Sequence, residues 1–184
     1  CTRRASSSAS DVYKRQVLWF GCRPSIDEKE LAYTKIIERN KPKDGFPKPV
    51  GYVNDFDSIF SVTEKNKLQD KLQRYDNLTY NRIILVTIPS YYQYSSIDDF
   101  AKNLGEQWDM TKKEIDNTIF IIVNLAQKEV KIEVGSTSEN FIQDSIKEKI
   151  TENLLQDALP QNKLYDGFDK AINKLIMARQ KSTF

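Results

Sequence analysis

The chain of 184 residues carries 28 Lys and Arg against 26 Asp and Glu, giving a formal net charge of +2, and it contains no histidine. The lack of histidine excludes Ser-His-Asp and Cys-His catalysis, His-ligated zinc and an imidazole proton shuttle. No Walker loop or GxGxxG motif occurs, so a glycine-rich phosphate cradle is not expected. The remaining chemistry is that of carboxylates, amides, hydroxyls and carbonyls, whose oxygens suit calcium or magnesium.

Residues 1–16 are predicted to be foreign to the protein. Residues 11–16, DVYKRQ, can be encoded by GAT GTG TAT AAG AGA CAG, which resembles the end of a transposase-based sequencing adapter translated in frame. We interpret residues 1–16 as an adapter-derived artefact; the alternative is a basic arm for nucleic acid or anionic lipid. Removing its four basic residues and one acidic residue leaves 24 and 25 in the rest of the chain, a net charge of −1. We therefore expect no nucleic-acid partner.

Residues 17–22, VLWFGC, resemble the end of a bacterial lipoprotein signal, in which a small residue precedes a cysteine that becomes lipidated. This resemblance implies that Cys22 anchors the protein to a membrane of the bacterial cell envelope, with the domain facing the periplasm or the cell surface. The alternative is a strand fragment with a buried free cysteine. No other segment of the sequence is apolar enough to be transmembrane.

Residues 23–46 are predicted to be a tether, because Lys, Glu, Asp and Pro dominate and few apolar residues fall in register. Residues 47–180 have the length of one domain. Its first helix is predicted after Ser61, which forms a capping box with Glu64. Residues 82–89, RIILVTIP, form an apolar run typical of a strand covered on both faces. An amphipathic helix over 97–108 follows, capped by Ser95 or Ser96.

Residues 118–124, TIFIIVN, predict a second buried strand, and residues 129–134, EVKIEV, alternate as a half-exposed strand does. The link of four residues between them is too short for a crossover, so the pair is predicted to be an antiparallel hairpin. Two more helical stripes follow, over residues 142–154 and 168–176. This order predicts an α/β fold, a three-layer α/β/α sandwich with a mixed, mainly parallel sheet and an antiparallel edge hairpin.

The hairpin register predicts where acidic side chains converge. If Asn124 pairs with Glu129, Asn117 lies opposite Ser136, and the loop after the hairpin returns to the start of the central strand. Carboxylates gathered there repel one another unless they are protonated or bridged by a cation. The alternative is that each is an ordinary solvated or capping side chain. The candidate cation ligands from this argument are Asp116, Asn117, Glu139 and Asp144.

Three blocks resemble the TPM domain family: FPKPVGYVNDFDSIFSVTE (46–64), IDNTIFIIVNLAQKEVKIEVGSTSENFIQD (115–144) and LYDGFDKAINKLI (164–176). The resemblance implies an α/β sandwich and an acidic cluster that binds calcium or a related divalent ion. It adds Asp55 to the candidate ligands, and it matches Asp116, Asn117, Glu139 and Asp144 to the family pattern. Family members include thylakoid-lumen proteins described as acid phosphatases, animal receptor-associated proteins and bacterial envelope proteins.

Two functions are predicted from these observations. The first is a membrane-anchored accessory domain of the cell envelope that binds a divalent cation, Ca²⁺ or Mg²⁺, and a protein partner. The alternative is a metal-assisted acid phosphatase, in which the cation polarises a phosphoryl oxygen, a carboxylate acts as base and Lys112 or Lys113 steadies the phosphate. Where the family pattern has glycine, this chain has Thr118, and its loop GSTSEN keeps Gly135 but has lost another glycine of the family pattern. Binding is therefore expected over catalysis.

The stretch SYYQYSS, residues 90–96, is a second candidate interaction site. It follows the carboxyl end of a predicted buried strand, where α/β sheets place ligands. Tyr91, Tyr92 and Tyr94 form either an exposed cluster for a protein or glycan, or a cover over the edge of the core.

Overall fold

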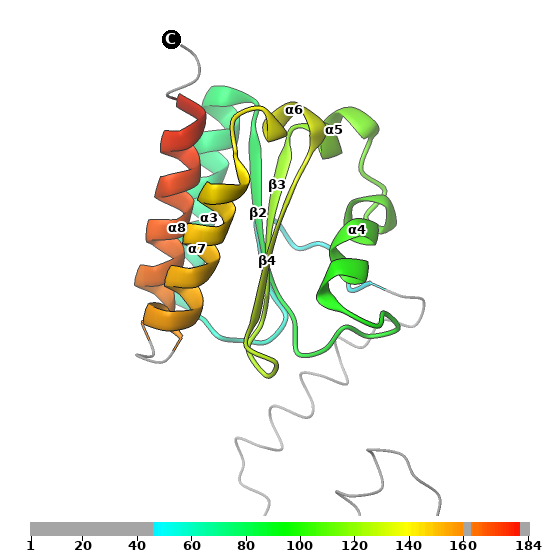
Figure 1. Ribbon diagram of the computed structural model, residues 1–184, viewed down its shortest axis with the longest axis vertical. Helices are drawn as coiled ribbons and strands as arrows, with labels where there is room; N and C mark the ends of the chain where they lie inside the picture. Colours follow the sequence, from blue (N-terminus) through cyan, green and yellow to red (C-terminus); the bar gives the residue numbers. More distant parts are fainter. Residues whose placement is uncertain (1–45, 160–162, 181–184) are drawn as a thin grey trace, which may run out of the picture. The chain divides into compact units, whose positions relative to one another are not determined.

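The computed structural model describes residues 46–159 and 163–180 (Figure 1). The predicted adapter segment, the lipidation site at Cys22 and almost all of the predicted tether lie outside the described residues and remain predictions. None of the helices in the described ranges is long and apolar enough to cross a bilayer.

The centre of the fold is one sheet of four strands in the order β1-β2-β3-β4. β1, β2 and β3 are parallel, and β4 runs antiparallel to β3 with Asn124 paired with Glu129. The predicted mixed sheet with an antiparallel edge hairpin is therefore confirmed. The strands are β1 (Val53–Asp55), β2 (Arg82–Thr87), β3 (Thr118–Asn124) and β4 (Glu129–Val134).

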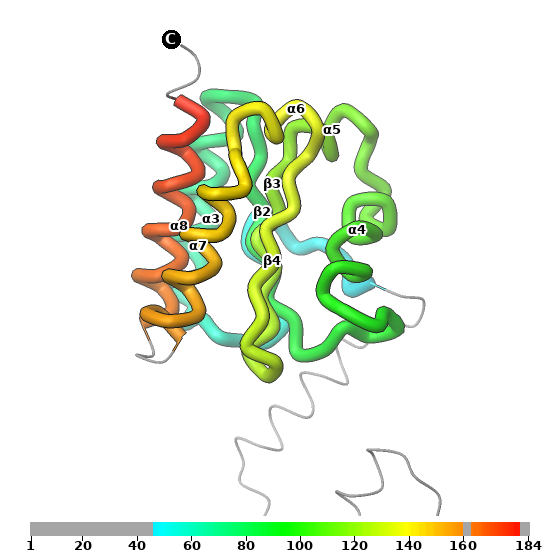
Figure 2. The backbone as a smooth tube through the Cα atoms, in the orientation of Figure 1, coloured from blue at the N-terminus to red at the C-terminus, as the bar shows by residue number. Residues whose placement is uncertain are grey.

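Helices cover both faces of this sheet, which gives the predicted sandwich (Figures 1 and 2). One face carries α3 (Val62–Thr79), α7 (Asp144–Asn153), its π-helical continuation η1 (Leu154–Ala158) and α8 (Leu164–Gln180), and the other carries α4 (Ile97–Gln107). Two short helices, α5 (Lys112–Asp116) and α6 (Ser136–Glu139), lie at the end of the sheet where β3 begins.

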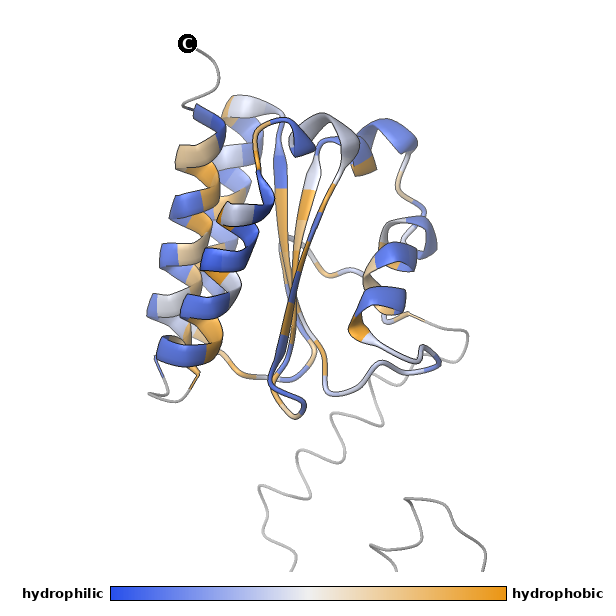
Figure 3. Cartoon of the chain, viewed as in Figure 1, coloured by the Kyte–Doolittle hydropathy of each residue, from blue (hydrophilic) through white to orange (hydrophobic). Residues whose placement is uncertain are grey.

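Alternation along the strands divides the core into two clusters. Odd-numbered side chains of β2 and β3, such as Leu85 and Ile121, pack with Leu72 of α3 and with α8, whereas even-numbered ones, such as Val86 and Ile122, pack with α4. Every residue of β3 is buried, as the sequence pattern predicts. Figure 3 shows this as mainly apolar strands between helices that each have a polar side.

The helix caps agree with the sequence pattern. Ser61 and Glu64 form the predicted capping box, in which Glu64 Oε2 accepts from the Ser61 N–H at 2.9 Å. Of the two candidates for capping α4, Ser96 is the N-cap, and its hydroxyl accepts from the Asp99 N–H at 3.1 Å. Both helices therefore begin where their caps satisfy free backbone N–H groups.

The two crossovers pass on opposite faces of the sheet. The chain leaves β1 through α3 on one face and leaves β2 through α4 on the other, yet both connections move one strand in the same direction. The two crossovers therefore have opposite hands, although right-handed crossovers strongly predominate in proteins. Because the chain turns away in opposite directions after β1 and β2, the carboxyl ends of these strands lie between two diverging loops.

Phe46, the last residue of the predicted tether, packs against the domain. The Phe46 ring packs on Phe100 of α4, with centroids 4.6 Å apart, and on Tyr94 at 4.9 Å. The Trp108 indole N–H donates to the Pro47 carbonyl at 2.7 Å. Phe46 therefore packs against the core on the α4 side.

Candidate functional site

The structure separates the five predicted cation ligands between the two ends of the sheet. Asp55 pairs with Thr87 at the carboxyl end of β2, whereas Asp116 and Asn117 precede the first residue of β3. Thr87 pairs with Val123, five residues along β3 from Thr118, and at ~3.3 Å per residue the two ends lie roughly 17 Å apart. The expectation that Asp55 joins the others in one cluster is therefore wrong, because it treats opposite ends of parallel strands as neighbours.

The hairpin argument holds at the amino end. The loop after the hairpin returns to the start of β3, where Ser136 donates a hydrogen bond to Asp116 Oδ1 at 2.9 Å, although the register predicts Asn117 rather than Asp116 opposite Ser136. Gly135 permits this contact, because a Cβ there would lie 2.0 Å from the Ile115 carbonyl oxygen. Asn117 ends α5, and its carbonyl accepts from the Arg82 N–H at 3.1 Å, so its backbone has a structural role.

Glu139 and Asp144 do not complete a group with Asp116. Glu139 is exposed at the end of α6. Asp144 is exposed in the first turn of α7, where Lys147 lies 2.6 Å from its carboxylate and lowers its pKa by hydrogen bonding and charge. Across residues 46–159 and 163–180, no three His, Cys, Asp or Glu side chains are grouped to hold a metal ion.

A different arrangement of polar groups lies at the carboxyl end of β1 and β2. The Asp55 carboxylate accepts from the N–H groups of Ile59 and Phe60, at 3.0 and 3.1 Å, and from the Thr87 hydroxyl at 2.6 Å. The Thr87 hydroxyl in turn accepts from the Asp57 N–H at 3.2 Å. Asp55 therefore folds the loop after β1, and Thr87, which is fully buried, links it to β2.

Tyr92, in the loop after β2, is the third polar group at this end. Its hydroxyl is buried and, among the described residues, is the one such side-chain atom without a hydrogen-bond partner. Burial, and then the negative charge of Asp57, raise the pKa of Tyr92 to about 12. The Asp57 side chain is itself buried, with 7% exposed. A neutral phenol and a carboxylate thus lie close together inside the loops.

Both loops contain strained backbone. Ser58, after β1, and Tyr92, after β2, have φ of 55° and 54°, in the left-handed region that non-glycine residues rarely adopt. Tyr80, Asp109 and Lys128 share this conformation at turns elsewhere in the described structure, so it does not by itself mark a site. We define the carboxyl-edge site as Asp55, Asp57, Thr87 and Tyr92, because it combines diverging loops and buried polar groups.

Comparison with known proteins places the chain in a family. A family model described as TPM domain matches residues 53–178, which include all four strands and most of α8. The chain belongs to the TPM domain family. No curated protein matches it in sequence.

Solved structures similar to this TPM domain support the fold. One is the solution NMR structure of the N-terminal domain of a protein from P. gingivalis, with 18% identity and a TM-score of 0.62, covering 71% of this chain and 83% of that one. Another is the NMR structure of the BA42 protein from the psychrophilic bacterium Bizionia argentinensis, also 18% identical, with a TM-score of 0.56, covering 66% and 82%. At this identity the likeness concerns the fold alone.

The three tyrosines of the TPM domain, predicted either to contact a partner or to cover the core, pack against the α4 side of the core. The Tyr92 ring stacks on Phe100 at 6.1 Å, and the Tyr94 ring meets it edge-on at 6.0 Å. The Tyr91 hydroxyl donates to Glu129 of the hairpin. The three tyrosines therefore cover the edge of the core, as one of the two alternatives predicts. Contact with a partner through their exposed parts stays a prediction.

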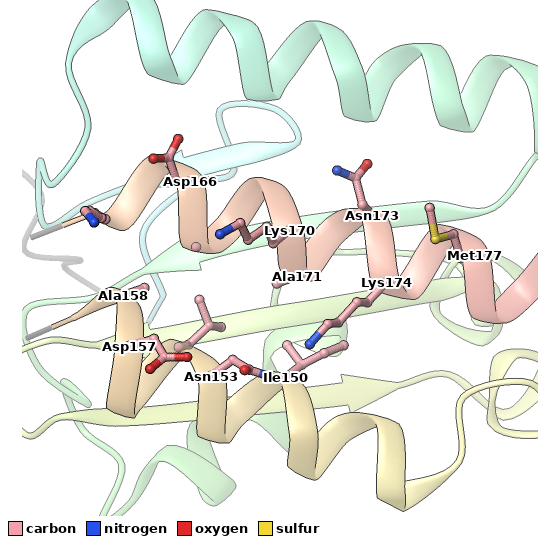
Figure 4. Close-up of a pocket in the computed structure, with 13 residues that line it drawn as sticks. Ile150, Asn153, Asp157, Ala158, Asp166, Lys170, Ala171, Asn173, Lys174 and Met177 are labelled. Atoms are coloured by element: carbon pink, nitrogen blue, oxygen red, sulfur yellow. The ribbon is translucent and has the colours of Figure 1, made fainter. Parts of the chain in front are cut away.

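The TPM domain also has a groove of about 590 Å³ between α7–η1 and α8 (Figure 4). Ile150, Leu154 and Ala171 form its apolar floor. Figure 4 shows Lys174 of α8 extending toward Asn153 on the opposite wall. None of the predicted ligands lines this groove, and its walls mix both charges, so it is not the predicted cation site.

Sequence reasoning missed two members of the carboxyl-edge site, Asp57 and Thr87. The sequence signal for Asp57 is its place two residues after Asp55, directly behind a short strand. The signal for Thr87 is weaker, since a threonine within an apolar strand also fits a structural role. Their meeting depends on β1 pairing with β2, which the sequence does not show.

Proposed function

We propose that this TPM domain is an accessory binding domain of the bacterial cell envelope, anchored to a membrane through lipidated Cys22. In this proposal it binds a divalent cation at the carboxyl-edge site and a protein partner. The observation that supports the cation most directly is the buried Asp57 carboxylate, whose negative charge a cation offsets. A water molecule held by the cation would accept from the buried Tyr92 hydroxyl, which has no hydrogen-bond partner in the described structure.

The donor set at this site fits a hard cation. Asp55 supplies a carboxylate that accepts from the Thr87 hydroxyl, and Asp57, whose backbone N–H donates to the same hydroxyl, supplies a second carboxylate. Oxygen donors are the ligands of Ca²⁺ and Mg²⁺, and Mg²⁺ sites commonly use one or two carboxylates completed by water. Asp55 Oδ2 accepts one hydrogen bond, from the Phe60 N–H, which leaves a lone pair for a ligand.

Binding is favoured over phosphatase activity by the protonation state of Tyr92 and by the position of the lysines. With its pKa raised to about 12, the Tyr92 phenol stays protonated at neutral pH and is a hydrogen-bond donor rather than a nucleophile. Lys112 and Lys113 lie on α5 at the opposite end of the sheet, away from Asp55 and Asp57. The groups of the phosphatase scheme are therefore not assembled at the carboxyl-edge site.

Thermal unfolding with added Ca²⁺ or Mg²⁺ tests the cation. A cation that binds the native state raises the unfolding midpoint with its concentration. We expect the wild type to show this rise, Asp57→Asn to abolish it, and Asp116→Asn, the matched control at the amino end, to retain it. A rise that survives Asp57→Asn but not Asp116→Asn would place the cation at the amino end and overturn the proposal.

Membrane anchoring has a separate test. In its native bacterium, the wild-type protein is expected in the membrane fraction, and Cys22→Ser is expected in the soluble fraction, because a lipid chain on the thiol supplies the membrane affinity. Equal partitioning of the two proteins would contradict lipidation at Cys22 without bearing on the cation site.

A further inference from the structure

The two edge strands of the sheet differ in how well they are protected against pairing with a further strand. β1, at one edge, has only three residues, and its Val53 N–H donates to the Gln69 side chain at 2.9 Å. β4, at the other edge, has six residues and contains neither proline nor glycine. Edge strands are commonly shortened, interrupted or covered because their free backbone groups can pair with another strand. Within the described structure β4 is neither shortened, interrupted nor covered, and its three charged residues, Glu129, Lys131 and Glu133, alternate in sign.

The backbone groups on the open side of β4 follow from the register. The Gly135 N–H donates to the Thr118 carbonyl at 2.9 Å, so this pair is hydrogen-bonded, and hydrogen-bonded pairs recur at every second residue of an antiparallel ladder. Lys131 and Glu133 therefore bond to β3. The residues that direct their N–H and C=O groups away from β3 are Val130, Ile132 and Val134.

The helical layers leave this edge accessible. In Figures 1 and 2, β4 is the strand nearest the viewer, and no described helix crosses in front of it. On the α7 side, a groove of about 610 Å³ runs beside Val130 and Ile132 and is bordered by Lys147 and Thr151. On the α4 side, Lys131 reaches Asp98 at 2.7 Å. A further strand can therefore lie alongside β4 between the layers.

The sequence of β4, EVKIEV, is complementary to itself when antiparallel about Ile132. In that register Ile132 pairs with Ile132 of a second copy, and Val130 pairs with Val134, so all the outward backbone groups form hydrogen-bonded pairs. Lys131 then lies opposite Glu133 in a pair without backbone bonds, where side chains approach most closely and opposite charges attract. A two-fold axis repeats every contact, as a symmetric dimer requires.

We propose that two copies of this domain pair through β4, antiparallel and centred on Ile132, to form a continuous sheet of eight strands. This interaction surface lies apart from the carboxyl-edge site and does not depend on the proposed cation. The shift that centres the pairing on Lys131 instead would place Lys131 against Lys131 and Glu129 against Glu133, so charge favours the register centred on Ile132 over that one. A register centred on Val130 also pairs opposite charges, Glu129 with Lys131, but it leaves Val134 outside the pairing.

Sedimentation velocity over a roughly hundredfold range of concentration tests the dimer, since its population must rise by mass action. Val130→Pro removes an outward N–H without breaking a bond to β3, and it is expected to abolish the dimer. Val130→Ala, which keeps that N–H, is the matched control and is expected to retain it. Circular dichroism checks that both variants stay folded.

Charge reversal tests the register. Glu133→Lys and Lys131→Glu each create like-charge pairs across the two-fold axis and are expected to weaken self-association by about tenfold or more. An equimolar mixture of the two variants restores opposite charges in a mixed dimer, so its dissociation constant should return to within about threefold of the wild type. A wild type that stays monomeric throughout, a dimer indifferent to Val130→Pro, or a mixture that does not associate would overturn the proposal.

Discussion

At the scale of single residues, burial of the Tyr92 hydroxyl lowers the free energy of unfolding by an amount that can be measured. The hydroxyl is buried without a hydrogen-bond partner in the described structure, so replacing it with hydrogen removes a desolvation penalty. We expect Tyr92→Phe to raise the free energy of unfolding by about 1 kcal/mol in the absence of added cation. Chemical denaturation gives this value directly.

Tyr91→Phe is the control for this change. Its hydroxyl donates to the exposed Glu129, which water can solvate after the substitution, so we expect an unchanged or slightly lower stability. A Tyr92→Phe variant that is less stable than Tyr91→Phe would show that the Tyr92 hydroxyl makes a favourable interaction in the free domain.

The same phenol predicts a pH dependence. Burial and the Asp57 charge raise the pKa of Tyr92 from 10.0 to about 12, so between these values the unfolded phenol ionises while the folded one keeps its proton. The unfolded state then binds fewer protons, and the free energy of unfolding falls as pH rises. Urea unfolding between pH 9 and 12 is expected to show a shallower fall for Tyr92→Phe. Identical slopes for the variant and the wild type would contradict the raised pKa.

At the scale of elements, Gly135 joins the hairpin to α5. A Cβ at this position would lie 2.0 Å from the Ile115 carbonyl oxygen and 2.5 Å from that of Asp116. Backbone must move to relieve both contacts, so we expect Gly135→Ala to lower the free energy of unfolding by about 2–3 kcal/mol. Chemical denaturation measures the loss.

Gly105→Ala is the matched control, because its Cβ would meet only the Ile115 side chain, at 3.1 Å or more. A side chain adjusts more easily than backbone, and alanine favours the helix, so we expect a change within about 1 kcal/mol. Equal losses for the two variants would show that the hairpin accommodates a side chain at Gly135.

The elements were largely predictable from the sequence, and the candidate site was not. Residues 82–89 and 118–124 predict buried strands because apolar residues occupy both faces, and the four-residue link after Asn124 allows only a hairpin. That local register also brought the loop after the hairpin back to Asp116, which accepts from the Ser136 hydroxyl. The carboxyl-edge site depends on β1 lying next to β2, a long-range pairing that three residues of strand do not encode. Asp55 was therefore grouped with residues at the wrong end.

At the scale of the whole molecule, the two helical layers differ in how many helices cover the sheet. One contains α3, α7 and α8, and the other depends on α4, with Phe46 and the tyrosines completing its core. Phe46 is half-buried and packs on Phe100. We expect Phe46→Ala to lower the free energy of unfolding by about 2 kcal/mol, less than for a fully buried phenylalanine.

Val50→Ala is the control for Phe46→Ala. Its side chain is 71% exposed, so its loss is expected to change stability by no more than about 0.5 kcal/mol. Chemical denaturation measures these changes. Equal stabilities of the two variants and the wild type would show that the Phe46 ring does not contribute to the stability of the domain.

The attachment of Phe46 and Pro47 to the α4 side determines how the fold responds to mechanical load. Tension applied to the chain ahead of Phe46 first reaches the Trp108–Pro47 hydrogen bond and the Phe46 ring contacts. It then acts on β1, whose three residues must shear past the parallel β2. Under a pull from this direction, we expect the first strand to detach before the helices and the hairpin unfold, and its loss removes Val53 from the core of the three-helix layer.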